Sequence, residues 1–216
     1  MDVFTLMRSW RYKCMNNIKL NGVVKSEPTF SHSSKGEDFF KFELEVIRKS
    51  GNLDILNCII PSVYADRIKS DDSVELDGEI RTRNEIVDEV TGKKRLVVYI
   101  FVKEVNEFIG YHDNEAVVYG FICKEPVFRT TPNGREICDL IIASNRASGR
   151  SDYIPTIAWG RTAQRLSVLD VGTCIELHGR MQSRTYTKVS DDGSSIEKTA
   201  YELSILYATE WSGENE

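Results

Sequence analysis

The stretch GFICKEPVFRTTPNG, residues 120–134, repeats a phrase found 98 positions earlier, GVVKSEPTF at residues 22–30. The offset persists along the chain: FKFELEVIR ends at Arg48 and CDLIIASNR at Arg146, while DILNCII begins at Asp54 and DYIPTIA at Asp152. Three residues are then inserted, and SVELDGEIRTR overlays CIELHGRMQSR at an offset of 101. Solenoid repeats have much shorter periods, so self-similarity over ~90 residues predicts two copies of a whole domain.

Each copy carries strand patterns in the same order. Apolar and polar residues alternate, or short apolar runs end at turn residues, as is typical of strands. The expected strands are 17–24, 39–48, 53–60, 74–83 and 95–105 in the first copy, and 116–123, 137–146, 153–159, 173–186 and 199–209 in the second. A short helix is expected between the third and fourth strand of each copy.

This order predicts an all-β chain of two tandem five-stranded Greek-key barrels, each an OB-fold. Gly22 and Gly120 lie inside the first strand of each copy, where a glycine suggests a bulge or sharp bend. The repeated phrase is therefore interpreted as the bend of strand one. The predicted boundaries are an N-terminal extension at 1–13, a divergent first barrel at 14–110, a second barrel at 111–211 and a short acidic tail at 212–216.

The composition is that of a folded protein, with 41% hydrophobic and 28% charged residues. No window approaches the ~18 apolar residues of a membrane-spanning helix, and the start lacks the features of a signal peptide, so a cytoplasmic location without membrane contact is expected. The five cysteines include no CxxC pair, which favours reduced thiols over disulfides or zinc.

Enzyme motifs are absent from the sequence. It contains no P-loop, no HExxH and no nucleophile elbow, and its three histidines are scattered. The chain is therefore expected to be a non-enzyme with no catalytic residues, no metal and no cofactor.

The second copy contains three characteristic stretches in this order: GFICKEPVFRTTPNGREICDLIIASNR, SDYIPTIAWGRTAQRL and VGTCIELHGRMQSRTYTK. Through them it resembles the bacterial single-stranded DNA-binding protein family. The resemblance covers roughly residues 114–211, and the first copy shares it only through its similarity to the second. It implies OB-folds that bind single-stranded DNA without sequence preference, with four barrels per assembly. Two barrels per chain then imply a homodimer. The resemblance further implies a role in DNA replication, recombination or repair, a nucleoid-associated place in the cytoplasm, and replication or repair proteins as candidate partners.

The resemblance also implies the site residues. The base-stacking aromatics of the family fall on Tyr153, Trp159 and Tyr186, and its phosphate-binding cations on Arg129, Arg161 and Arg184. Tyr153 and Trp159 are six residues apart on one strand, so both face the same side of the sheet. Further candidate cations end matching strands or lie in the loops between the last two strands: Arg48, Arg83, Lys93, Lys94, Arg146 and Lys188. For Arg48 and Arg146 a loop contact or a shared salt bridge is an equal alternative.

The net charge of −5 argues mildly against nucleic acid, but eight arginines follow residue 112 and can both stack on bases and bind phosphate. The first copy has Ile55, Pro61 and Glu85 where the second has its aromatics, and the sequence given ends WSGENE without the Pro-Phe tip of the family. Two other functions therefore stay open. One is an OB-fold scaffold in a replication, conjugation or phage complex with weak DNA affinity, and the other is RNA binding.

Overall fold

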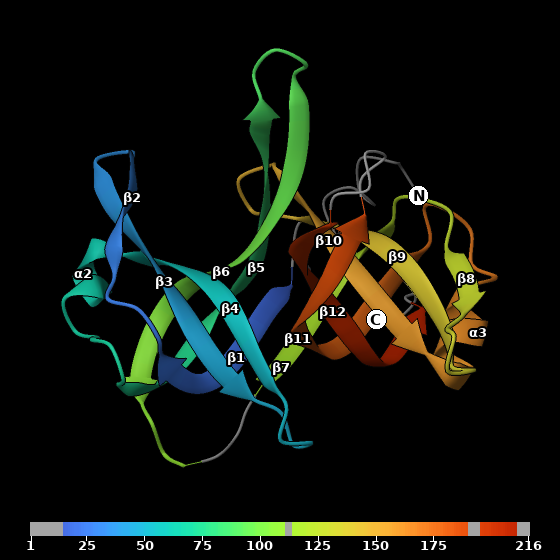
Figure 1. Cartoon of the computed structure of the whole chain (residues 1–216), viewed down its shortest axis with the longest axis horizontal. Helices are drawn as coiled ribbons and strands as arrows, with labels where there is room; N and C mark the ends of the chain where they lie inside the picture. Colours follow the sequence, from blue (N-terminus) through green and yellow to red (C-terminus); the bar gives the residue numbers. More distant parts are fainter. Residues whose placement is uncertain (1–14, 111–113, 190–194, 211–216) are drawn as a thin grey trace, which may run out of the picture.

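Strands dominate the computed structural model, which describes residues 15–110, 114–189 and 195–210 (Figure 1). The first half contains β1 (Asn16–Val24), β2 (Thr29–Ser34), β3 (Glu37–Ile47), β4 (Leu53–Pro61), α2 (Ser62–Ala65), β5 (Ser73–Asp88) and β6 (Lys93–Glu107). The second half repeats this order with β7 (Asn114–Ile122), β8 (Val127–Thr130), β9 (Glu136–Asn145), β10 (Ser151–Trp159), α3 (Gly160–Leu166), β11 (Cys174–Val189) and β12 (Ser195–Glu210). The predicted extension and tail lie outside the described residues.

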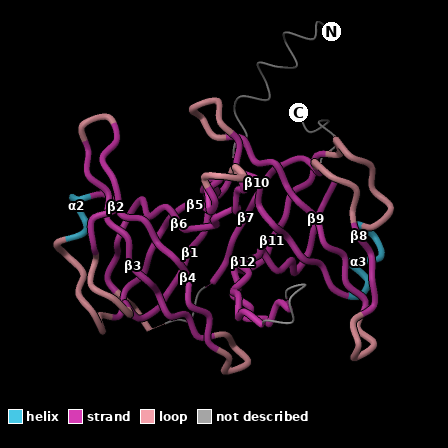
Figure 2. The backbone as a smooth tube through the Cα atoms, turned by 45° about the horizontal axis from the view of Figure 1, so that its top comes forward, coloured by secondary structure: helices cyan, strands magenta, loops and turns pink. Residues whose placement is uncertain are grey.

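Each half closes into a barrel of five strands. In the first, β1 pairs with both β3 and β5, β3 pairs with β4, β4 runs parallel to β6, and β6 pairs with β5. The second barrel closes in the same way through β7, β9, β10, β12 and β11, with β10 parallel to β12. This confirms the all-β prediction of two OB-folds. Figure 2 shows the two barrels side by side, with their short helices toward opposite ends.

The structure adds one short strand per barrel that the sequence analysis did not expect. β2 pairs with β3, and β8 pairs with β9, so each lies at an outer end of the sheet order. Nearly every residue of β2 and all of β8 are exposed. Strands without a buried face have no apolar alternation, which is why periodicity does not reveal them.

The bend predicted at the repeated glycine is present in both copies. β1 pairs with β5 along most of its length and then reaches β3 at Val23 and Val24. A Cβ at Gly22 would lie 2.4 Å from the carbonyl oxygen of Glu45, and one at Gly120 would lie 2.7 Å from that of Ala143. Only glycine permits so close an approach of two backbones, and this approach closes the barrel.

The two barrels are joined by antiparallel pairing of β1 with β7. Ile18 pairs with Ala116, its own counterpart in the repeat, so the copies are related by an approximate twofold axis. Each strand also anchors a long strand of its own barrel. The Asn16 side chain exchanges hydrogen bonds with the backbone of Ile80 at 2.6 and 2.9 Å, and Asn114 does the same with Met181 at 2.7 and 2.9 Å.

Two buried ion pairs, one in each barrel, make hydrogen bonds to the opposite barrel in matching positions. Arg48 donates to Asp54 at 2.5 and 2.6 Å, and Asp54 accepts the backbone N–H of Ser183 at 2.6 Å. In the twofold-related arrangement, Arg146 donates to Asp152 and Asp152 accepts the N–H of Thr82. Both aspartates are fully buried. The turn after β3 in the first barrel and the turn after β9 in the second are therefore each tied to the opposite barrel.

Candidate nucleic-acid interface

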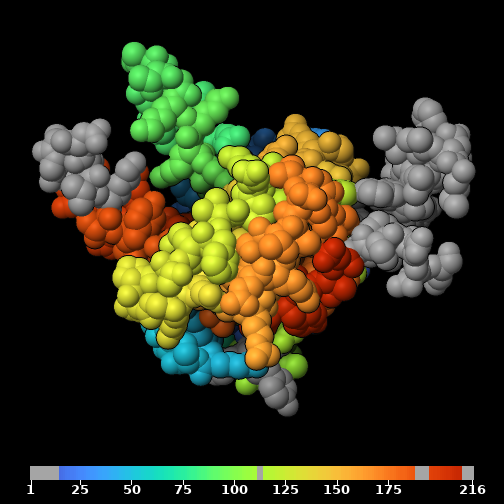
Figure 3. Space-filling model, turned by 90° about the vertical axis from the view of Figure 1, so that its right-hand side faces the viewer, coloured from blue at the N-terminus to red at the C-terminus, as the bar shows by residue number. Residues whose placement is uncertain are grey.

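A groove of about 850 Å³ opens on the second barrel and is completed by a loop of the first. We call it the second-barrel groove. Its floor is formed by β10, β11 and β12, and its far wall by the loop that follows β3. The lining residues central to its chemistry are Trp159, Arg180, Gln182, Arg184, Ser204, Arg135 and Arg48. Figure 3 views the second barrel from the side of β8–β10, with the β5–β6 hairpin in green standing out beyond it.

Trp159 is the aromatic residue of this groove. It is the last residue of β10 and directly precedes α3, in an extended conformation. Its indole N–H donates to Ser204 Oγ at 3.2 Å, which fixes the ring orientation, and 37% of the residue remains exposed. Ile154 and Ala158 of the same strand are fully buried and fill the barrel instead. Trp159 therefore offers a ring surface to solvent.

Tyr153 and Tyr186 also face outward, with 47% and 38% of their surface exposed. Tyr153 lies near the junction of the barrels, where its backbone N–H donates to Thr82 Oγ1 at 2.8 Å. Tyr186 is on β11 beside Arg184, whose guanidinium carbon lies 5.4 Å from the centre of the ring. None of the three predicted aromatics is used to fill the core, although their role in binding stays a prediction.

Arg184 and Arg180 are the cations of the groove floor. Arg184 is half exposed and only loosely paired, with Nε 3.8 Å from Glu202. The sequence analysis did not select Arg180, although its spacing of four from Arg184 on one strand places both on the same face. Its Nε is buried without a hydrogen-bond partner in the described structure, and burial followed by the nearby Arg48 charge lowers its pKa. An anion in the groove would relieve both conditions.

The other predicted cations are more dispersed. Arg129 is held by Asp139 at 2.7 Å on the β8–β9 side, and Arg161 is exposed on α3; neither lines the groove. Arg83 pairs with Glu85 at 2.7 Å. Lys93 and Lys94 are exposed at the start of β6, on the projecting β5–β6 hairpin (Figure 1). The side chain of Lys188 lies outside the described part of the structure.

Arg48 and Arg146 are already engaged within the fold. The salt-bridge alternative left open by the sequence is realised, because each arginine forms an ion pair with an aspartate of its own barrel. Each arginine also contacts a strand of the other barrel: Arg48 reaches the Ser183 carbonyl and Arg146 the Thr82 carbonyl, each at 3.2 Å. The hydrogen bond to Asp54 is the main cause that raises the pKa of Arg48, and the bond to Asp152 does the same for Arg146. Their first role is to hold the barrels together.

No three or more metal-binding side chains cluster within residues 15–110, 114–189 and 195–210. The four cysteines in these ranges are free thiols. No described helix is long and apolar enough to cross a membrane.

Comparison with known proteins bears on this barrel. The model of the "Single-strand binding protein family" matches residues 113–206. This match spans most of the second barrel and less than half of the chain. Single-stranded DNA-binding protein A of Bacillus subtilis is 34% identical over 80 residues, which cover 34% of this chain and 46% of that protein. The single-stranded DNA-binding protein of Oceanobacillus iheyensis is 29% identical over 90 residues, covering 38% of this chain and 55% of the relative.

These matches span about half the length of the curated relatives. Among solved structures, the wild-type single-stranded DNA binding protein from Thermus aquaticus superimposes with a TM-score of 0.71 at 16% identity, over 92% of this chain and 93% of that one. At this identity the likeness concerns the fold, and it extends over both barrels of the chain.

Proposed function

We propose that this chain binds single-stranded DNA without sequence preference, chiefly through the second barrel, in DNA replication, recombination or repair. The observation that carries the proposal is the second-barrel groove, where the exposed ring of Trp159 lies together with Arg180 and Arg184. A non-specific binder of single strands needs ring faces on which bases stack and cations along the phosphate path. The match of the second barrel to the single-strand binding protein family and the names of its relatives support the same function.

The net charge of −5 does not oppose this function, because charge distribution near the strand matters more than its sum. Of the residues that the structure describes, four arginines and no carboxylate line the groove. The chain acts by binding and not by catalysis, in the cytoplasm beside the nucleoid. We further propose a homodimer, which brings four barrels together, and recruitment of replication or repair proteins.

The test is a titration of labelled oligo-dT by anisotropy, with Trp159→Ala as the informative variant. Loss of one stacking platform should cost about 1–3 kcal/mol per base, or roughly a 5- to 150-fold weaker Kd. Tyr207→Ala is the matched control, because this exposed aromatic of the same barrel stacks on His178 and does not line the groove. An unchanged Kd for Trp159→Ala would remove the central residue of the proposal.

Oligo-rU and duplex DNA, each at two salt concentrations, separate the other functions. Binding of dT should weaken as salt rises, because phosphate neutralisation releases counterions. A preference for rU would indicate an RNA-binding protein. Failure to retain any oligonucleotide would indicate a scaffold.

A further inference from the structure

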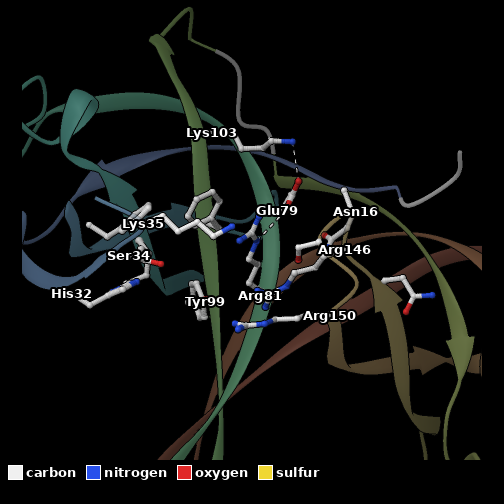
Figure 4. A pocket seen from close by; sticks show the side chains of 16 residues that line it. Asn16, His32, Ser34, Lys35, Glu79, Arg81, Tyr99, Lys103, Arg146 and Arg150 are labelled. Carbon is white, nitrogen blue, oxygen red and sulfur yellow. Dashed lines mark hydrogen bonds and ion pairs between the residues drawn. The ribbon is translucent and has the colours of Figure 1, made fainter. Parts of the chain in front are cut away.

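The first barrel has its own groove, which the sequence comparison of the two copies did not reveal. It has a volume of about 780 Å³, and we call it the first-barrel groove. Its walls come from β2, β3, β5 and β6 and from the loop after β9 of the second barrel. Figure 4 shows side chains of the first barrel converging with Arg146 and Arg150 of the second. The residues that matter here are Tyr99, Phe101, Arg81, His32, Phe39, Lys35, Lys103, Arg146 and Arg150.

This groove is the twofold counterpart of the second-barrel groove. On its floor Glu79 pairs across the strands with Phe101, and Arg81 with Tyr99. The equivalent pairs in the second barrel are Arg180 with Ser204 and Gln182 with Glu202. Aromatic rings therefore stand on β6 where β12 has small or acidic residues. The position of Trp159 is taken in the first barrel by Pro61.

The rings of the first-barrel groove are stacked with cations. The Arg81 guanidinium carbon lies 3.9 Å from the centre of the Phe101 ring, and that of Arg83 lies 5.6 Å from Tyr99. Phe39 packs beside Phe101 with ring centres 5.9 Å apart, and His32 stacks on Phe39 at 5.1 Å. A guanidinium group can stack on a flat group such as a nucleobase as well as lie over an aromatic ring.

The groove is also cationic. Among the described residues, its lining contains one carboxylate, Glu79, and five cations: Lys35, Arg81, Lys103, Arg146 and Arg150. The charge of Arg146 is balanced by Asp152. Burial acts to raise the pKa of Glu79, but hydrogen bonds from Lys103 and Arg81 at 2.8 Å outweigh this effect and leave the pKa below its ordinary value. Glu79 therefore neutralises one charge and positions two cations. The positive excess suits a polyanion.

The first-barrel groove is open and contains aromatic rings next to positively charged side chains. This arrangement suits a single nucleic-acid strand, in which bases and phosphates alternate. We propose that the first-barrel groove is a second binding site for single-stranded DNA, with Arg81, Tyr99 and Phe101 as its stacking platform. This inference rests on the proposed function of the chain. Arg150, supplied by the second barrel, brings a phosphate contact to the first, so the site is composite and depends on the joined barrels.

The test compares short and long oligo-dT on the full chain. In Tyr99→Ala/Phe101→Ala, binding of long dT should weaken by about 5- to 150-fold for each stacked base that is lost. The number of nucleotides covered per chain should also fall, while short dT held by the second-barrel groove keeps its Kd. The matched control is Phe30→Ala, an exposed aromatic of the same barrel that lies outside both grooves.

Phe101 is partly buried against Phe39, so its removal can disturb folding. Arg150→Glu provides an independent variant, because this exposed loop residue has no role in the core. It should weaken long dT and shorten the covered length as well. Ultraviolet crosslinking of wild type to dT, followed by peptide mapping, should find crosslinks at residues 99–101 in addition to Trp159.

The outcomes separate the two proposals. If the wild type retains no dT at all, the proposed function fails. If the wild type binds dT and Trp159→Ala weakens this binding, the proposed function stands. The first-barrel groove is then not a binding site if Tyr99→Ala/Phe101→Ala and Arg150→Glu bind dT like Phe30→Ala and residues 99–101 do not crosslink.

Discussion

The two barrels share their buried contacts and differ in the side chains that face solvent. Asn16 and Asn114 make the same hydrogen bonds. The Arg48–Asp54 and Arg146–Asp152 pairs each accept a backbone hydrogen bond from the other barrel in the same way. On the groove floors, by contrast, none of the compared cross-strand pairs is the same. The architecture of the repeat is thus maintained by a few buried polar contacts, while the binding surface is free to place its rings on different strands.

The largest effect is expected at the crossing ion pairs. Asp54→Ala and Asp152→Ala each leave a partly buried arginine without its partner, and each should lower the free energy of unfolding by about 3–5 kcal/mol. Denaturant unfolding measures this. Asp139→Ala, which removes only the exposed pair with Arg129, should cost at most about 1 kcal/mol. Clearly unequal losses at Asp54 and Asp152 would contradict the equivalence of the two contacts.

A smaller and again equal effect is expected at a pair of bulge glycines. The strand register shifts at Gly78 in β5 and at Gly179 in β11, and a Cβ there would lie 2.5 Å from the Phe101 carbonyl oxygen and 2.4 Å from that of Ser204. Alanine at either position should destabilise the chain by about 1–3 kcal/mol, since the backbone must shift. Ser73→Ala, at an exposed position of β5, should stay within about 0.5 kcal/mol of wild type. Thermal unfolding of the three variants decides whether the bulges are equivalent.

The smallest effect concerns two matched surface arginines, and it should differ between the barrels. Arg184 is loosely paired with Glu202, whereas its counterpart Arg83 is held by Glu85 at 2.7 Å. Arg184→Ala should therefore reduce the slope of log K against log salt for dT by about 0.7, the value for one phosphate contact on a single strand. Arg83→Ala should change the slope less. Equal slopes for both variants would mean that the ion pair with Glu85 does not keep Arg83 from contacting phosphate.

Much of the fold could be predicted from the sequence, because strand periodicity and repeated glycines are local signals. The even spacing of Tyr153 and Trp159 predicted that they share one face of the strand, and the buried Ile154 and Ala158 show that this face is the outer one. The exposed strands β2 and β8 gave no such signal. The crossing contacts of Asp54 and Asp152 could not be predicted, because a repeat in sequence does not define how its two copies dock.

The first-barrel groove was missed for a related reason. In the alignment of the two copies, Ile55, Pro61 and Glu85 occupy the positions of the three aromatic residues of the second barrel, so at these positions the first barrel lacks stacking rings. The rings stand instead on β6, at Tyr99 and Phe101, and Arg81 covers one of them. Strand alternation predicts that Tyr99, Phe101 and Arg81 lie on one face of β5 and β6. Their approach to Arg150 depends on how the two barrels are joined, which the sequence does not define.

The pairing of β1 with β7 within one chain has a consequence for how the molecule behaves at low abundance. Two barrels on separate chains would come apart on dilution, whereas here a short tether keeps their mutual effective concentration on the order of millimolar. Every copy of the chain therefore carries its paired barrels as a finished unit, whatever the number of copies in the cell.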